Sequence, residues 1–518
     1  MRETIRTFHG LAPKLEGNLP LGFAVQALDV DVSSGKIQPV RENRYVTAVT
    51  GAPSDIILRS GVWQYGTSRY FAPWTYGDLD LLWYLDSGTV KRRVGAGAED
   101  DAGLDKPPDI VSAATGGAGS LTGTYQYVVV HKRVVGGYTD FSQPSDPSAE
   151  VVAAAQEIDV QRGAIADPDV THWWLFRIGS TTGQYEFVAE IAAATATYTD
   201  DLEDAELGEG LLTWYTSRQG NQILLTKPPA LDGLCPELHY NMLLGWAGAT
   251  LYASEPNMPD GWDQNVFLRR FPSTIRDVRV IGTGLVAVVT DEAVWRMYGS
   301  EPELFRPERA LTPLPARAGR GAEGRGGLFY LTPDGVAYFD GTSCSVYSQP
   351  EFDRDWFLEH IPAAGSHMSF TDGILRLFHT GGYLQAQHLE TKTWTQGSDV
   401  CTASWVDPVT RKQYVAIGTG IYELHGSESE YKTWTWRSAD MLLGTELNKF
   451  FQPIEVQGSG TVTVTAYVDG VLAGGPKTLE WNSERGRRLK LHRARGRALQ
   501  VELSGTGEVY ELAVEGGL

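Results

Sequence analysis

The sequence predicts an all-β protein built around a β-propeller of about six blades. The first observation is a set of short, apolar, β-branched runs at residues 278–299, separated by turns rich in Gly, Thr and Asp. Such runs are typical of strands joined by hairpins. The second observation is repetition, because the pattern returns at residues 242–254, 327–341, 374–390 and 414–426. The interval is about 40–45 residues, as in propeller blades. Sheets this small cannot bury both faces alone, so several must stack around an axis.

Composition excludes several classes of protein before any motif is considered. The chain has 518 residues, too many for one core, and it has no apolar stretch of about 18 residues that could span a membrane. Its first residues lack the apolar core of a secretion signal, so we expect it to stay in the cytoplasm or to leave by a route without a signal. Only Cys235, Cys344 and Cys401 occur, an odd number without CxxC spacing. Structural disulfides and zinc sites are therefore not expected.

The formal charge of −20 bears on nucleic-acid binding. Affinity for DNA comes mainly from neutralising phosphates with Lys and Arg, so an acidic surface disfavours tight binding over a broad area. The same charge suits a surface past which DNA moves without adhering. Solubility is the simpler explanation of the charge, and the sequence leaves both open.

Two predicted regions precede the repeats. Residues 1–45 predict an extended N-terminal arm, because Gly and Pro interrupt each of its short apolar pieces. Such an arm needs a surface to lie against, and without a core of its own it should be dispensable for folding of the propeller. Residues 46–106 contain the strand-like pieces DIILRS, SRYFAPW, LLWYLD and TVKRRV, which predict a first blade separated from the others.

The sequence pattern changes at residues 107–210. About seven short alternating strands, with a turn signal roughly every ten residues, predict a β-sandwich inserted after the first blade. The region resembles a fibronectin type III domain through Tyr125 and Tyr127 in an early strand, then SQPSDPSAEV, WWLFR and a closing TYTDD. The acidic run at residues 200–209 is expected to form a solvated exit linker. The remaining blades are assigned to residues 211–430.

The segment RAGRGAEGRGG at residues 317–327 interrupts the later blades. It lacks the Gly-Lys-Ser/Thr ending of a phosphate-binding P-loop. One interpretation is a mobile connection between blades. The other is a loop that faces a channel, in which Arg317, Arg320 and Arg325 contact the phosphates of passing DNA.

Residues 431–518 predict a second β-sandwich that closes the chain. Alternation is clear at residues 461–468, where every second residue is Val or Ala and the others are mostly Thr. A basic segment follows. Its charges read as the exposed face of a strand pair, or alternatively as a face toward an acidic neighbouring subunit, another partner or nucleic acid. The residues concerned are Arg485, Arg487, Arg488, Lys490, Arg493, Arg495 and Arg497.

The search for chemistry predicts no catalytic centre, no cofactor and no metal site. The ten histidines are scattered without HExxH spacing, and no GxSxG elbow occurs. Asp353 and Asp355 are a carboxylate pair of the kind that glycosidases use, but EFDRDWFLEH reads as a short helix between blades with its charges in water. The sequence therefore predicts a protein that is not an enzyme. A propeller glycosidase would need two carboxylates converging at the axis.

The order of parts is more informative than any single motif. The opening FHGLAPKL…NLPLGFAVQALDVDVSSGKIQPVR resembles that of the nozzle, or tail tubular, proteins of short-tailed bacteriophages, in which FxGxAPxL is followed by LP and by SGxLxPxR. An inserted fibronectin-like domain, a VWRMYGSEP hairpin, a YLTPDGVAYFDG blade and a closing sandwich entered through TWRS are also similar to members of that family. The matching residues of the opening are Phe8, Gly10, Ala12, Pro13, Leu15, Leu19, Pro20, Ala27, Ser34, Gly35, Ile37, Pro39 and Arg41.

The resemblance implies a virion structural protein. Six copies would form a ring below the portal and its head-tail adaptor and would conduct the DNA during ejection. Tail fibres or spikes would attach at the periphery, and contact with double-stranded DNA would be transient. Assembly would take place in the cytoplasm of the host bacterium. Reduced cysteines, rigid β domains and an acidic surface agree with this role, and head-to-tail interfaces that close form rings.

A second class of function stays open. The chain could be a receptor-binding or carbohydrate-binding tail protein, which predicts aromatic platforms beside carboxylates on an exposed face. Trp63, Trp74 and Trp83 are candidates for such a platform. They could equally pack one blade against the next.

Overall fold

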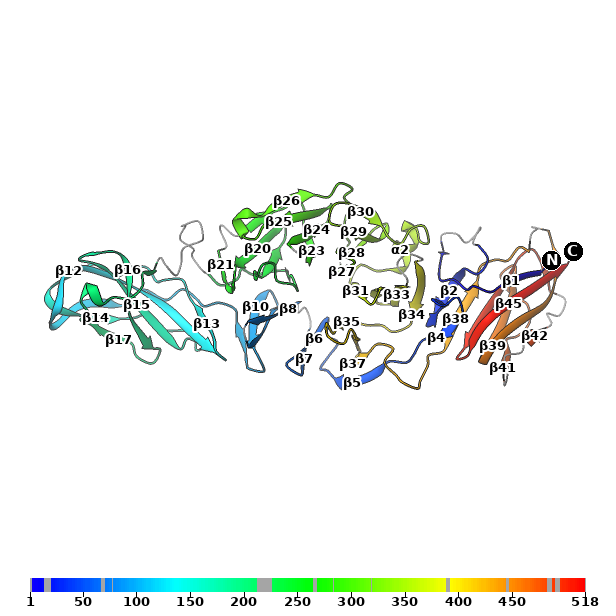
Figure 1. The fold of residues 1–518 in the computed structure, drawn as a ribbon, viewed down its shortest axis with the longest axis horizontal. Coiled ribbons are helices and arrows are strands. Elements are labelled where there is room, and N and C mark those ends of the chain that lie inside the picture. The colour runs from blue at the N-terminus through cyan, green and yellow to red at the C-terminus, as the bar shows by residue number, and fades with distance from the viewer. Residues whose placement is uncertain are drawn as a thin grey trace.

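The computed structural model describes residues 2–13, 20–66, 70–76, 78–211, 226–263, 268–282, 284–317, 319–387, 392–443, 447–481, 487–489 and 494–517. The molecule is elongated, with a sandwich at one end, a propeller in the middle and a second sandwich at the other end, where both termini lie (Figure 1). Strands dominate its secondary structure, which confirms the predicted all-β, propeller-containing fold class. Within these ranges, no helix is long and apolar enough to cross a membrane.

Among the described residues, six blades of four or five strands and one two-stranded hairpin build the propeller, and the blade formed by β31–β34 is part of a 14-stranded sheet that continues into the terminal sandwich. The first two blades are β8 (Tyr70–Tyr76), β9 (Leu79–Asp86), β10 (Thr89–Val94) and β11 (Glu99–Asp101), and then β18 (Gly233–Leu234), β19 (Leu244–Ala247), β20 (Thr250–Glu255), β21 (Met258–Trp262) and β22 (Leu268–Arg270). The next two are β23 (Ile275–Ile281), β24 (Leu285–Thr290), β25 (Val294–Tyr298) and β26 (Arg306–Arg309), and then β27 (Ala322–Gly324), β28 (Gly327–Thr332), β29 (Gly335–Phe339) and β30 (Cys344–Val346). The last two are β31 (His367–Thr371), β32 (Ile374–His379), β33 (Gly382–Gln387) and β34 (Thr393–Gly397), and then β35 (Ala403–Val406), β36 (Gln413–Ile417), β37 (Gly420–Glu423) and β5 (Arg44–Ala48). The hairpin is β6 (Asp55–Arg59) and β7 (Val62–Gly66).

The innermost strands form a closed ring. Contacts run from β6 to β8, from there through the β18–β19 sheet to β23, and then through β27, β31 and β35 back to β6. Tight hairpins connect the strands within a blade. Between β31 and β32, for example, Asp372 and Gly373 have φ of 48° and 77°. Two consecutive positive φ values define the type I′ turn, whose twist matches that of the strands it joins.

Residues 46–106 differ from the single blade that the sequence predicts. β5 pairs with β37, so the early strand completes the blade formed by β35–β37. The β6–β7 hairpin is a separate unit, and β8–β11 form a complete four-stranded blade. A strand from near the N-terminus thus closes the ring with main-chain hydrogen bonds to its last blade. With the β6–β7 hairpin, the described residues form a ring of seven units, one more than the expected count of about six.

The inserted sandwich contains β12 (Ser112–Val135), β13 (Tyr138–Phe141), β14 (Val151–Gln161), β15 (His172–Gly179), β16 (Thr182–Ala192) and β17 (Thr197–Asp200). β12 is long enough to pair with β14 along its first half and with β15 along its second. The strands enclose a core that includes Tyr127, Ile158 and Trp173, each fully buried. The short 3-10 helix η2 (Asp204–Glu206) lies in the expected acidic exit linker.

The terminal sandwich is built on β39 (Lys449–Val468), which pairs with β45 (Glu508–Gly517) along one part and with β44 (Leu499–Gly505) along the other. Around it lie β38 (Trp434–Ser438), β40 (Val471–Leu472), β41 (Lys477–Trp481), β42 (Arg487–Leu489) and β43 (Arg495–Gly496). Its buried residues alternate along the strands, as the sequence predicts: Val462, Val464 and Ala466 face the core.

The N-terminal segment lies against the rest of the molecule, as the sequence predicts for a segment without a core of its own. β1 (Arg2–Ile5) pairs with β45, and β2 (Ala24–Leu28) lies between β38 of the terminal sandwich and β34 of the propeller. The short β3 (Val30–Asp31) and β4 (Gln38–Pro39) pair with each other. Ile5, Phe8, Ala27 and Ile37 are buried in the same core as the terminal sandwich. The segment therefore joins two bodies of the molecule.

The described residues of the propeller also include a short α-helix between two blades and a 3-10 turn within one blade. α2 (Arg354–His360) follows β30, and Asp353 caps it by accepting a 2.9 Å hydrogen bond from the Trp356 N–H. This confirms the short helix expected there, and Phe357 is its buried side chain. The 3-10 helix η3 (Pro302–Leu304) connects β25 to β26.

Candidate functional site

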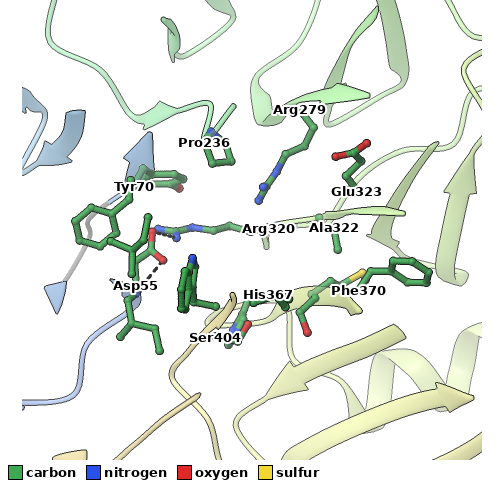
Figure 2. Close-up of a pocket in the computed structure, with 18 of the residues that line it drawn as sticks. Asp55, Tyr70, Pro236, Arg279, Arg320, Ala322, Glu323, His367, Phe370 and Ser404 are labelled. Atoms are coloured by element: carbon green, nitrogen blue, oxygen red, sulfur yellow. Dashed lines mark hydrogen bonds and ion pairs between the residues drawn. The ribbon is translucent and has the colours of Figure 1, made fainter. Parts of the chain in front are cut away.

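The inner strands of the propeller surround an axial cavity of about 800 Å³. Residues of β6, β8, β23, β27, β31 and β35 line it, and Pro236 and Glu237 contribute from the loop after β18. All seven units of the ring thus supply part of the wall, which places the cavity on the propeller axis. Figure 2 shows side chains from these separate segments directed into the same space.

Arg320 crosses this cavity toward β6 and β8. Its Nη1 lies 2.7 Å from Oδ2 of Asp55, and its guanidinium carbon lies 3.7 Å from the ring centroid of Tyr70 (Figure 2). Burial raises the pKa of Asp55, and the neighbouring guanidinium limits that rise. Burial alone would lower the pKa of Arg320, but Asp55 and Tyr70 outweigh it, so Arg320 stays charged. The pair ties the segment before β27 to the opposite side of the ring.

A second charged group forms around β23. Asp277 and Arg279 are two residues apart and share a face of that strand. Arg279 donates from Nε to Oδ2 of Asp277 at 3.1 Å and lies 3.4 Å from Oε1 of Glu237. The same Asp277 oxygen accepts a 2.7 Å hydrogen bond from the Gly321 N–H. Burial raises the pKa of Glu237, while Arg279 opposes the shift.

His367 of β31 also lines the cavity. Burial lowers the pKa of His367 to about 4, and the nearby Arg320 acts in the same direction. The imidazole is therefore neutral at physiological pH. Its ring stacks on Phe378 with centroids 4.9 Å apart. This contact holds the side chain in the wall.

Two of the three predicted loop arginines, Arg320 and Arg325, line the axial cavity, and Arg317 does not. Arg320 points into the propeller and is paired with Asp55. Arg317 donates to the Phe357 carbonyl of α2 at 3.5 Å. Arg325 is exposed on the turn between β27 and β28, and its carbonyl accepts a hydrogen bond from the Tyr338 hydroxyl. The segment is thus built into the edge of a blade.

The predicted basic segment lies on the terminal sandwich. Arg487 of β42 is exposed and donates to the carbonyl of Glu480 at 3.0 Å. Arg495 of β43 lies over the ring of Phe450, and Arg497 is exposed. Arg488 also belongs to β42. Arg485, Lys490 and Arg493 lie outside the described residues.

The candidate tryptophan platform is used for packing. Trp83 is fully buried, and Trp74 packs beside it with ring centroids 5.6 Å apart. Trp63 of β7 contacts Trp405 and Tyr414 of the neighbouring blade at 5.6 and 5.1 Å. Trp63 thus joins two blades, whereas Trp74 and Trp83 pack together within one blade, and the three do not present one open aromatic face.

Two carboxylates at the propeller axis are better placed for a functional site than Asp353 and Asp355, the pair noted in the sequence. Asp353 is the cap of α2, and Asp355 lies in the exposed first turn of that helix. Asp55 and Glu237, by contrast, both line the axial cavity. Each is held by an arginine in an ion pair, Asp55 by Arg320 and Glu237 by Arg279.

A buried ionic cluster between the propeller and the inserted sandwich was not found from sequence. Nη1 of Arg92, on β10, lies 2.9 Å from Asp140 of β13 and 2.8 Å from Asp260 of β21. Nη2 of Arg133, on β12, lies 2.6 Å from Oδ2 of Asp140, the oxygen that Arg92 also contacts, and the Trp83 indole N–H donates to Asp260 at 2.8 Å. Burial lowers the pKa of Arg92, but the two carboxylates outweigh it and keep Arg92 charged.

One local signal could have revealed the cluster. In TVKRRV, Val90, Arg92 and Val94 occupy alternate positions and are all buried, so an arginine stands where the period-2 pattern requires an inward residue. A charge at an inward strand position needs a buried partner. That partner is separated along the chain, and sequence pattern alone does not name it.

Comparisons with known proteins give weak structural similarity. No protein-family model and no curated protein matches the chain. BamB from Moraxella catarrhalis aligns with a TM-score of 0.30 and 8% identity, covering 76% of this chain and 99% of that one. Virginiamycin B lyase from Staphylococcus aureus aligns with a TM-score of 0.31 and 8% identity, covering 74% and 98%. Similarity of this size carries no argument about activity. The chain is a propeller-based protein on the evidence of its own sheets.

Proposed function

We propose that this chain is a tail nozzle protein of a short-tailed bacteriophage. In this role six copies form a ring below the portal and its adaptor, and the ring conducts the DNA during ejection. Tail fibres or spikes bind at its periphery. The observation that carries the proposal is the position of the opening motif: the described residues that resemble the nozzle family lie at the junction between propeller and terminal sandwich.

The first half of the motif, FxGxAP, fits that junction closely. Phe8 is buried against Trp436 of β38, with ring centroids 5.2 Å apart in a T-shaped arrangement. At Gly10 a Cβ would lie 2.0 Å from the carbonyl oxygen of Trp394 in β34, so only glycine allows the approach. Ala12 is fully buried. Packing therefore explains the residue type at each of these three positions.

The second half, SGxLxPxR, is connected to the first. The Phe8 N–H donates to the carbonyl of Gly35, whose φ is 78°. Ile37 exchanges two main-chain hydrogen bonds of 3.0 Å with Val509 of the terminal sandwich. Arg41 donates to the Ser427 carbonyl at 3.2 Å. The motif as a whole specifies one compact joint, which suits a subunit that must be stiff. Leu15 and Leu19 of the motif lie outside the described residues.

The ring model needs several copies because the propeller does not supply the channel itself. The side chains of Arg320 and Asp55 meet across the axial cavity. A DNA channel is therefore assigned to the space between subunits, where an acidic protein of net charge −20 lets the phosphate backbone slide. The inserted sandwich, fixed by the Arg92–Asp140 pair, is a rigid projection to which a peripheral partner can bind.

Negative-stain electron microscopy of the purified full-length chain tests the proposal. The expected particles are six-fold rings with a central hole. A compact monomer that retains sugars on an affinity resin would favour the carbohydrate-binding alternative, and turnover of a polysaccharide would favour an enzyme. Either of these outcomes without rings contradicts the nozzle role.

A further inference from the structure

The wall of the axial cavity carries charges of both signs. Its described charged residues are the arginines Arg276, Arg279, Arg320, Arg325 and Arg411 and the carboxylates Asp55, Glu237 and Glu323. Each of the four arginines named next has a carboxylate within ion-pair distance. The pairs are Arg276–Asp291, Arg279–Asp277, Arg320–Asp55 and Arg411–Asp372. Beside each of these four arginines an anionic ligand would also meet a carboxylate. The pairing therefore weakens the attraction of the wall for a simple anion.

Several of these groups remain within reach of a ligand. The side chains of Glu237, Arg320 and Asp55 are 34%, 21% and 16% exposed. Their ion pairs fix them in place, so a ligand would not have to order them on binding. Phe370 and Trp405 also line the cavity and are half-buried. The site thus combines oriented donors and acceptors with apolar ring surface.

We propose that the axial cavity binds a neutral, hydroxyl-rich small molecule, a mono- or disaccharide. Each hydroxyl is both a donor and an acceptor, so it can lie between a guanidinium and a carboxylate and satisfy both. The C–H face of a sugar ring would pack on the aromatic side chains. The volume of about 800 Å³ is within the range of pockets for ligands of this size. This inference does not depend on the nozzle role.

Calorimetric titration of the full-length protein tests the binding. The probes are glucose, galactose, N-acetylglucosamine, maltose and lactose, with inorganic phosphate as the anionic comparison. We expect saturable binding of at least one sugar and weaker or no binding of phosphate. Phosphate binding more tightly than every sugar would overturn the proposed ligand class. No saturable binding of any of the five sugars would overturn the site.

Substitutions place the ligand in the cavity. Glu237→Gln keeps the shape of the side chain but removes the charge-assisted hydrogen bond, and we expect affinity to fall by about tenfold. Glu480→Gln, the same change at an exposed residue of β41, is the matched control and should bind as the parent does. Parental affinity in Glu237→Gln would contradict the assignment.

Hydrogen exchange gives a readout that does not depend on any variant. Saturating sugar should slow exchange of main-chain amides in β6, β27 and β31, which surround the cavity. Protection confined to the inserted or terminal sandwich would place the ligand elsewhere and refute the axial site.

Discussion

The propeller is held at its two ends by opposite chemistry. Toward the inserted sandwich the joint is ionic, with Arg92 fully buried between Asp140 and Asp260. Toward the terminal sandwich the joint is mainly apolar and aromatic, with Phe8 buried against Trp436, and Lys432 also pairs there with Asp29 and Asp399. In Figure 1 these joints lie on opposite sides of the propeller.

The difference shows what each joint has to specify. Ion pairs and charge-assisted hydrogen bonds are directional, so the ionic joint fixes the angle at which an inserted domain projects. Removing one partner leaves a buried charge uncompensated, which makes the joint sensitive to single substitutions. The apolar joint gains its stability from buried area and from a strand, β2, that belongs to both bodies. The stability of the apolar joint should therefore depend less on pH than that of the ionic joint.

The largest effect is expected at the ionic joint. Asp140→Ala leaves Arg92 and Arg133 without their shared partner, and we expect a loss of about 3–5 kcal/mol in the stability of the sandwich–propeller interface. Asp146→Ala is the control, because the Lys106–Asp146 pair is exposed and should cost about 0–1 kcal/mol. Chemical unfolding monitored by hydrogen exchange measures both. Equal costs for the two variants would contradict the ionic account of this joint.

Acid should loosen the ionic end before the apolar end. Burial lowers the pKa of His131, on β12, from 6.5 to about 4, with Arg162 acting in the same direction and Asp167 and Asp105 against it. As pH falls, the unfolded state takes up the proton first, so stability is full above about pH 6.5 and is lost progressively toward pH 4. The expected loss is about 3 kcal/mol.

Hydrogen exchange at pH 7 and pH 4.5, corrected for intrinsic rates, measures this prediction. Protection of β12 should fall more than that of β39 and β45. His131→Gln removes the titrating group and should flatten the response of β12. An unchanged pH response in that variant would assign the acid sensitivity to other groups.

The apolar joint should respond most to a change of shape. Gly10→Ala places a methyl group against the Trp394 carbonyl, and we expect a loss of about 1–3 kcal/mol in the stability of the terminal joint. Gly475→Ala is the matched control, because a Cβ there meets nothing within 4 Å and its φ is not positive. Limited proteolysis of the N-terminal segment and thermal unfolding distinguish the two. Identical behaviour would show that the close approach at Gly10 is not required.

Much of the propeller could be predicted from local pattern. The predicted runs at residues 285–289 and 294–298 are close to β24 and β25, and the hairpins at 327–341 and 414–426 correspond to β28–β29 and β36–β37. Apolar alternation and Gly- or Asp-containing turns are local signals, so a single sequence reveals them. The closing role of β5 has no such signal, because its partner strand β37 lies far along the chain.

The candidate site was less accessible to sequence reasoning. Arg320 lies in a glycine-rich segment without periodicity, so nothing local shows that it turns inward toward Asp55. The axial cavity itself is formed by residues from seven separate segments, and its charge pairing is a property of the closed ring. Gly and Pro interrupt the N-terminal segment, and for that reason the sequence predicts an extended arm there. In the structure those interruptions allow it to pass between two bodies at a joint built around Gly10.

Native mass spectrometry of the purified full-length protein tests the central claim most directly, because the proposed role requires identical subunits to close into a ring. We predict a principal species of six times the 56.7 kDa of the chain, alone or after addition of the head-tail adaptor protein. A monomer as the only species at every concentration, with and without the adaptor, would contradict the account.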